Sequence, residues 1–271
     1  MNIFKFEFKR LLKSGIIWSL VCGFLIILFI SLFPAMEDMG MKELVNAKMQ
    51  GLSLDLLKAF NIDAAVDFTN IFDYLGYVIQ YIGMASAVYG AILGVSALIR
   101  EESQGTIEFL YSKPITRTKI VTAKLGSVFA MFCTYIVILC IFTTGMCYIV
   151  KPEDVDIIDL IINIKSVFMG ISIVGVVFMS IGLLISAIIK SDKGAISIAI
   201  GIFFVSYFLG MVGKLKESFN WLKYFSPFDY FIPSEIMKNG LDFTYIIISL
   251  CVIIACISSS YIIYRQKDMN I

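Results

Sequence analysis

Six stretches of this chain contain no aspartate, glutamate, lysine or arginine. They are Ser14–Met36, Tyr74–Ile99, Leu125–Val150, Ser166–Ile189, Gly194–Gly213 and Phe243–Tyr264. A helix that rises 1.5 Å per residue needs roughly 18–20 residues to cross about 30 Å of hydrocarbon, and every stretch is at least that long. Strands of a membrane barrel instead alternate over about ten residues. The pattern predicts an all-α integral membrane protein with transmembrane helices at about 15–35, 75–99, 125–150, 166–189, 194–213 and 243–264.

The composition agrees with this class. Apolar residues make up 59% of the chain and charged residues 16%, whereas soluble domains have about 45–50% and about 25%. The longest segment between predicted spans is 37–73, so we expect residues 1–271 to form a single transmembrane domain without a soluble one. Segment 37–73 is expected outside the cell, flat on the membrane surface; a role in gating a substrate is an alternative.

The charge distribution predicts the orientation. The N-terminus, the loops 100–124 and 190–193 and the C-terminal tail together carry 13 basic and six acidic residues. The other side carries 9 basic and 15 acidic residues. Basic loops stay in the cytoplasm, so we expect a multi-pass protein of the plasma membrane with both termini cytoplasmic.

The first residues, 2–13, form an amphipathic pattern and are expected to be an elbow helix in the headgroup layer. Its apolar side consists of Ile3, Phe4, Phe6, Phe8, Leu11 and Leu12, and its charged side of Lys5, Lys9, Arg10 and Lys13. An ordinary basic leader into the first span is the alternative. The apolar stretch that follows is too long for the core of a cleaved signal peptide.

The chain lacks the residues that membrane chemistry needs. Its predicted spans contain no carboxylate, lysine or arginine, although pumps and gradient-driven carriers usually retain such residues there, and histidine is absent from the sequence. Cys133, Cys140 and Cys147 repeat every seven residues, which is typical of helix packing rather than of a metal site. No phosphate-binding G-x-x-x-x-G-K-[ST] loop occurs. We therefore expect no catalytic residue, metal or bound cofactor, and no nucleic-acid partner; a separate subunit must supply the energy for any uphill transport.

Only one predicted cytoplasmic loop, 100–124, is long enough to contact such a subunit. Gly105 interrupts the preceding span, Thr106 is a plausible N-cap, and Glu108 lies in the first turn, where the helix dipole favours an acid. The apolar side of this short helix would consist of Ile107, Leu110 and Tyr111, and Pro114 would end it. Such a helix suits a groove on a partner; a basic connector at the membrane surface is the alternative. Thr116 can cap a second helix that leads into the third span, with Arg117, Lys119 and Lys124 at the lipid headgroups.

The run from Arg100 to Lys124 resembles the signature of ABC-2 type exporter permeases, and the likeness extends over essentially the whole chain. The matching residues are Arg100-Glu101-Glu102, Gly105-Thr106-Ile107-Glu108-Phe109-Leu110, Ser112-Lys113-Pro114-Ile115-Thr116-Arg117 and Lys124. The resemblance implies a six-span subunit that pairs with a second permease subunit, identical or different, and with two cytoplasmic ATPases that use the ATP. It also implies that the loop is a coupling helix that contacts the ATPase through Glu101, Gly105, Thr106, Ile107, Glu108, Leu110, Tyr111, Pro114 and Arg117.

Two further patterns concern packing. Gly83, Gly90 and Gly94 in the second span permit close approach of another helix. The segment 214–242 combines many aromatic residues with Pro227 and Pro233. We expect one or two short helices there that dip into the outer leaflet; a plain aromatic-belt loop is the alternative.

Together these features predict the membrane subunit of an ATP-driven exporter for a hydrophobic or amphipathic cargo, such as a drug, an antimicrobial peptide or a lipid. Two other functions remain open at this point. One is an ATP-independent channel or carrier, and the other is a membrane anchor or regulatory protein that docks a cytoplasmic partner without transport.

Overall fold

The computed structural model describes residues 3–38, 67–103, 116–189, 194–215 and 217–267. All regular elements in these ranges are helices, which confirms the predicted all-α class. The long helices are α1 (Ile3–Ser31), α5 (Ile71–Ser103), α7 (Arg117–Val150), α8 (Ile157–Ile188), α9 (Ala195–Leu215) and α11 (Phe243–Gln266). The short ones are α2 (Phe33–Asp38), η1 (Glu217–Phe225), η2 (Pro227–Phe231) and α10 (Pro233–Asn239).

Within the described ranges, six helical segments are long and apolar enough to cross a membrane, as predicted. They are Ile3–Met36, Ile71–Arg100, Arg117–Val150, Ile157–Ile188, Ala195–Leu215 and Phe243–Gln266. Several of these helices are longer than the charge-free stretches, because the side chains that cap them precede those stretches in the sequence. Thr116 accepts a hydrogen bond from the Lys119 amide and so begins α7, as the sequence predicts, and Asp156 caps α8 through the Ile158 amide.

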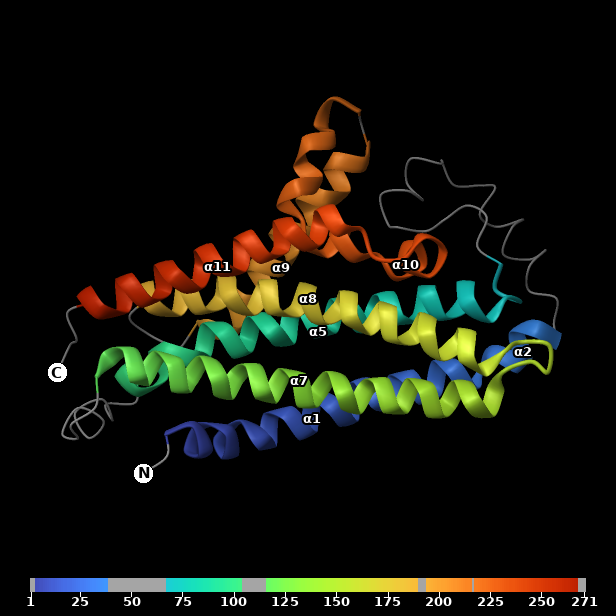
Figure 1. The fold of residues 1–271 in the computed structure, drawn as a ribbon, viewed down its shortest axis with the longest axis horizontal. Helices are drawn as coiled ribbons and strands as arrows, with labels where there is room; N and C mark the ends of the chain where they lie inside the picture. The colour runs from blue at the N-terminus through green and yellow to red at the C-terminus, as the bar shows by residue number, and fades with distance from the viewer. Residues whose placement is uncertain (1–2, 39–66, 104–115, 190–193, 216, 268–271) are drawn as a thin grey trace.

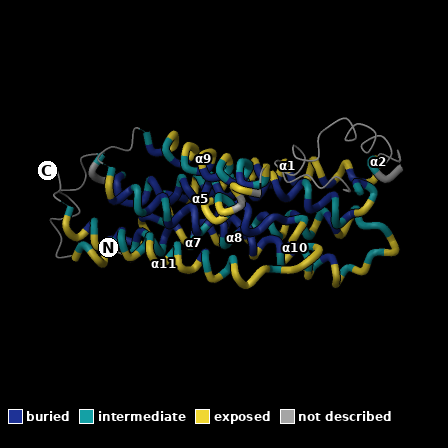
Figure 2. Tube along the Cα trace, turned by 90° about the horizontal axis from the view of Figure 1, so that it is seen from above, coloured by how far each residue is buried: buried dark blue, intermediate teal, exposed yellow. Residues whose placement is uncertain are grey.

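The helices lie side by side in a bundle whose centre is the pair α5 and α8. Figure 1 shows α1 and α7 along one side of this pair and α11 along the other. α9 packs on α5 and α11 on α8, so α9 and α11 lie on different faces of the pair (Figure 2). α5 and α8 make the most extensive helix contact, followed by α1 with α7. α1 begins and α11 ends at the same end of the bundle, where α5 also ends and α7 begins (Figure 1). We call this the loop end.

The peripheral helices expose apolar side chains, as a surface in contact with lipid requires. Ile16, Leu20 and Phe24 of α1, and Phe204 and Phe208 of α9, are each more than half exposed. Figure 2 shows exposed segments along the outer helices and buried ones through the middle of the bundle. The helical backbone satisfies its own polar groups, so such surfaces can face hydrocarbon.

Small residues allow α5 and α8 to meet backbone to backbone. A Cβ atom on Gly90 would lie 2.4 Å from the Gly175 carbonyl oxygen, and one on Gly94 would lie 2.1 Å from the Met179 carbonyl oxygen. A Cβ atom on Gly182 of α8 would lie 2.7 Å from the Ala91 carbonyl oxygen of α5. Gly83, the third glycine of the pattern, has more room and lies near Ile171 of α8.

The segment between α9 and α11 contains three short helices, rather than one or two. Pro227 and Pro233 occupy the first helical position of η2 and α10, where proline's fixed φ and missing N–H do no harm, so each begins a new helix. Phe228 packs edge-on against Phe203 and Tyr207 of α9. Gly240, at φ 76°, ends α10. The segment therefore docks on the bundle, and its depth in a membrane stays a prediction.

At the N-terminus, most of the expected elbow helix and the first span form one uninterrupted helix, α1. The placement of 2–13 in the headgroup layer also stays a prediction. The expected outer segment 37–73 lies largely outside the described residues.

Candidate functional site

The candidate site is the loop end, where α5 and α7 flank the predicted coupling helix. Glu101 belongs to the last turn of α5, and Arg117 is the first residue of α7. The other predicted coupling residues lie outside the described ranges; they are Gly105, Thr106, Ile107, Glu108, Leu110, Tyr111 and Pro114. The structure therefore defines how the two ends of this loop are attached to the bundle.

Lys124 joins the two helices that flank the loop. Its side chain is 1% exposed, and its Nζ donates a hydrogen bond of 2.8 Å to the Ala97 carbonyl oxygen of α5. The sequence placed this lysine at the lipid headgroups, because it directly precedes a charge-free stretch. It is instead buried between helices, where an ammonium group requires hydrogen bonds and a nearby negative charge.

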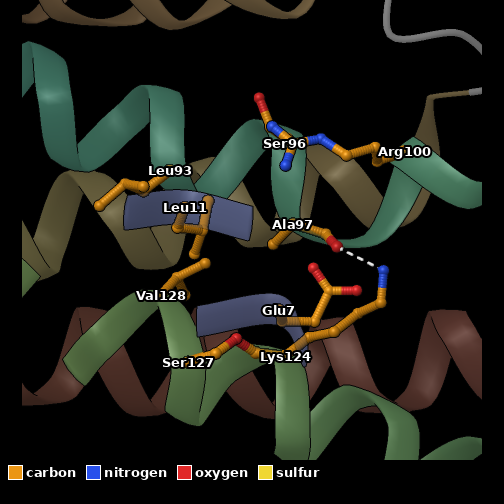
Figure 3. A pocket seen from close by; sticks show the side chains of 9 residues that line it. All are labelled: Glu7, Leu11, Leu93, Ser96, Ala97, Arg100, Lys124, Ser127 and Val128. Atoms are coloured by element: carbon orange, nitrogen blue, oxygen red, sulfur yellow. Dashed lines mark hydrogen bonds between the residues drawn. The ribbon is translucent and has the colours of Figure 1, made fainter. Parts of the chain in front are cut away.

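Glu7 of α1 supplies a negative charge in the same region. It is 7% exposed, and Figure 3 shows its carboxylate beside the Lys124 side chain. The sequence contains an indication that Glu7 is buried. Glu7 is the only acid among the first 36 residues, and it lies four residues from both Ile3 and Leu11, which are buried on the same face of α1.

A small cavity lies among these groups. Its volume is about 10 Å³, near the lower limit for one water molecule. The residues that line it are Glu7, Leu11, Leu93, Ser96, Ala97, Arg100, Lys124, Ser127 and Val128, contributed by α1, α5 and α7 (Figure 3). A carboxylate, an ammonium, a guanidinium and two hydroxyl groups thus meet where three helices converge at the loop end. The cavity is too small for a cargo molecule.

The end of α5 is also attached to α8. The Ser186 hydroxyl of α8 accepts hydrogen bonds from the backbone amides of Leu98 and Ile99, at 2.9 and 3.1 Å. Ser186 itself is fully buried. The last turns of α5 before the loop are therefore attached to α7 through Lys124 and to α8 through Ser186.

Arg117 attaches the start of α7 to the end of α11. Its guanidinium Nη1 donates to the carbonyl oxygens of Tyr264, Arg265 and Lys267, at 3.4, 3.1 and 2.6 Å. Carbonyl groups at a helix C-terminus lack intrahelical donors and carry partial negative charge, so a guanidinium is a suitable partner.

Two further contacts extend this attachment. The Thr122 and Tyr261 hydroxyl groups, from α7 and α11, lie 2.7 Å apart. The Lys267 Nζ in turn donates to the Ile189 carbonyl oxygen at the end of α8, at 2.8 Å. Side chains thus connect the beginning of α7 with the ends of α11 and α8.

We expect Arg117→Ala to loosen the end of α11. The change removes the donor shared by three carbonyl groups, a contribution of about 1 kcal/mol. Amide hydrogen exchange in the last turn of α11 should accelerate roughly fivefold, as measured by mass spectrometry in detergent. Arg265→Ala is the matched control, because its side chain is exposed. Equal exchange in the two variants would contradict the assigned role of Arg117.

A separate charged contact lies at the C-terminal end of α9. Lys214 forms an ion pair with Asp229 of η2, and both side chains are largely buried. Nearby, burial raises the pKa of Tyr230 to about 12. Its hydroxyl therefore remains protonated at neutral pH and donates to the Tyr224 carbonyl oxygen. These contacts hold the short helices against α9, and no step of transport follows from them alone.

The sequence profile described as ABC-2 family transporter protein matches residues 1–269. The chain belongs to this family. A search of curated proteins found no match. The ABC-2 protein is accordingly a membrane permease subunit of a transporter. The resemblance stated for the sequence is confirmed at the level of the family.

Proposed function

We propose that this ABC-2 protein is the membrane subunit of an ATP-driven exporter, and that residues 101–117 couple it to a separate ATPase. The observation that carries the proposal is the attachment of both ends of the loop. Lys124 and Ser186 hold the end of α5, and Arg117 holds the start of α7 against α11. A force applied to the loop would therefore reach α5, α7, α8 and α11 through short hydrogen bonds.

The remaining parts of the proposal rest on the sequence and on family membership. Two copies of a cytoplasmic ATPase would bind ATP and move the loop, and a second permease subunit, identical or different, would complete the pathway. Both termini and the loop end would face the cytoplasm, because that end carries the excess of basic residues. The plasma membrane is the proposed location.

The cargo is proposed to be hydrophobic or amphipathic. The surfaces that a second subunit could share, on α1 and α9, expose mainly isoleucine, leucine, valine and phenylalanine. A drug-like molecule, an antimicrobial peptide or a lipid would leave water for such a surface at a gain of roughly 25 cal/mol per Å² of apolar area. A strongly hydrophilic cargo would find few partners on these surfaces.

The proposal predicts that Glu108→Lys combined with Leu110→Asp abolishes co-purification of the ATPase. The double change reverses a charge and places a carboxylate on the apolar side of the expected coupling helix. The readout is the ratio of ATPase to permease after affinity purification in mild detergent, together with ATP-dependent cargo export from cells. Glu153→Lys is the control, because it changes one exposed acid in the connection between α7 and α8.

The result separates the three functions. An exporter loses both co-purification and export in the double variant, and retains both in the control. A regulatory anchor would lose its partner in the double variant, but the unmodified protein would support no export. Export that persists without any ATPase would identify a channel or carrier and would overturn the proposal.

A further inference from the structure

The first turns of α1 carry charged residues on two different sides. Glu7 points inward and is buried, in line with Ile3 and Leu11. Lys5, Lys9 and Lys13 are exposed, and their spacing of four residues places them in one row along the helix. We call Lys5, Lys9 and Lys13 the lysine row. The one acid of this helix, Glu7, lies on another side, near the half-buried Arg10, so the lysine row itself contains no acid.

The lysine row continues into a surface that faces lipid. Ile16 and Leu20 follow Lys13 at spacings of three and four residues, and they are 54% and 61% exposed. The row is therefore the polar end of an apolar stripe that is in contact with hydrocarbon. Phe4 and Phe6 are exposed beside it, and aromatic side chains concentrate at the boundary between lipid and water. These neighbours favour a position of the row at the level of the lipid headgroups, as the sequence predicts.

The three ammonium groups differ from three other basic groups at the loop end. Lys124, Arg117 and Lys267 donate to backbone carbonyl groups of neighbouring helices. Across the residues that the structure describes, no hydrogen bond or ion pair engages the lysine row. The row is about 12 Å long, given the rise of a helix. Its flexible side chains can therefore reach phosphate groups over the full headgroup layer, which is about 5–8 Å thick.

We propose that the lysine row is a binding site for anionic phospholipid headgroups in the leaflet at the loop end. Three adjacent positive charges without an acid on their face complement a headgroup with net negative charge. A zwitterionic headgroup carries its own cation, which opposes binding at such a row. The site is independent of cargo transport and of the ATPase, and it selects lipids by headgroup charge.

The test measures lipids retained by the purified full-length chain in native mass spectrometry. Phosphatidylglycerol and phosphatidylcholine with identical acyl chains serve as the probes. We expect preferential retention of phosphatidylglycerol. Each Lys→Gln change in the row should weaken phosphatidylglycerol binding by about fivefold, and the triple variant by on the order of 100-fold. Retention should also fall as the ionic strength rises.

Two controls separate a specific row from general charge effects. Lys165→Gln removes another exposed lysine, from α8 near the opposite end of the bundle, and should leave retention unchanged. Replacing the three lysines by arginine preserves the charge and should preserve the preference. Single variants at Lys9 supply the result if the triple variant does not fold. Equal retention of both lipids, or an equal loss in the Lys165 variant, would overturn the proposal. Displacement of phosphatidylglycerol by millimolar inorganic phosphate would also overturn it, because the row would then be a general phosphate site.

Discussion

Lys124→Met is expected to destabilise the protein by about 3 kcal/mol, one of the two largest effects that the structure predicts. Methionine fills a similar volume but cannot donate to the Ala97 carbonyl oxygen. It also removes the cation beside the buried carboxylate of Glu7 (Figure 3). The measurement is the free energy of unfolding, from denaturant titration in mixed micelles followed by circular dichroism.

Two comparisons isolate the cause of this loss. Lys119→Met changes an exposed lysine on the same helix and should shift the free energy of unfolding by no more than about 0.5 kcal/mol. Glu7→Gln in the Lys124→Met background should recover part of the stability, because a neutral amide is less costly to bury than an unbalanced carboxylate. If Lys124→Met behaves like Lys119→Met, then Lys124 is not buried as described.

Gly94→Ala should have an effect of similar size, about 3 kcal/mol, for a steric reason. The new Cβ would lie 2.1 Å from the Met179 carbonyl oxygen and 2.9 Å from the Leu183 amide nitrogen. Both are backbone atoms of α8, so no side-chain rotation can relieve the clash and the two central helices must separate. The same unfolding experiment measures the loss.

Gly201→Ala provides the matched control on α9. Apart from the nearby backbone of its own helix, no described atom lies within 4 Å of the position that its Cβ would occupy. Alanine also has the higher helix propensity, so this variant should be as stable as the original or up to about 1 kcal/mol more stable. Unchanged stability in Gly94→Ala would contradict the close approach of α5 and α8.

The fold was largely predictable because a membrane imposes strict rules on sequence. Runs without charge identify the six spans, since each ionised side chain in hydrocarbon is costly. The positions of the helix ends required local chemistry. Thr116 was recognised as a cap, whereas the cap at Asp156 was not, and α8 consequently begins earlier than the charge-free stretch. The number of short helices before α11 was underestimated, because a proline can begin a helix as well as end one.

The candidate site was predictable only in part, because its contacts connect residues far apart in the chain. The loop pattern indicated an ATPase contact, but it contained no information on what holds the loop. Lys124 bonds to a carbonyl group 27 residues away, and Arg117 to carbonyl groups about 150 residues away. Every residue has a backbone carbonyl group, so residue types do not indicate which carbonyl accepts a hydrogen bond. Neither contact could therefore be derived from the sequence. Glu7 was also missed, although a single acid in a basic leader is a signal that the sequence does contain.

The glycine contact between α5 and α8 has a consequence for how the protein can move. Two helices that interlock through backbone atoms cannot slide or rotate past each other without a clash, so α5 and α8 form one rigid body. The neighbouring α7 and α11 are joined to this body and to each other partly by exposed or half-buried polar groups, which exchange partners far more easily. During transport, α7 and α11 would therefore move relative to the α5–α8 pair. The two helices of the pair would keep their positions relative to each other.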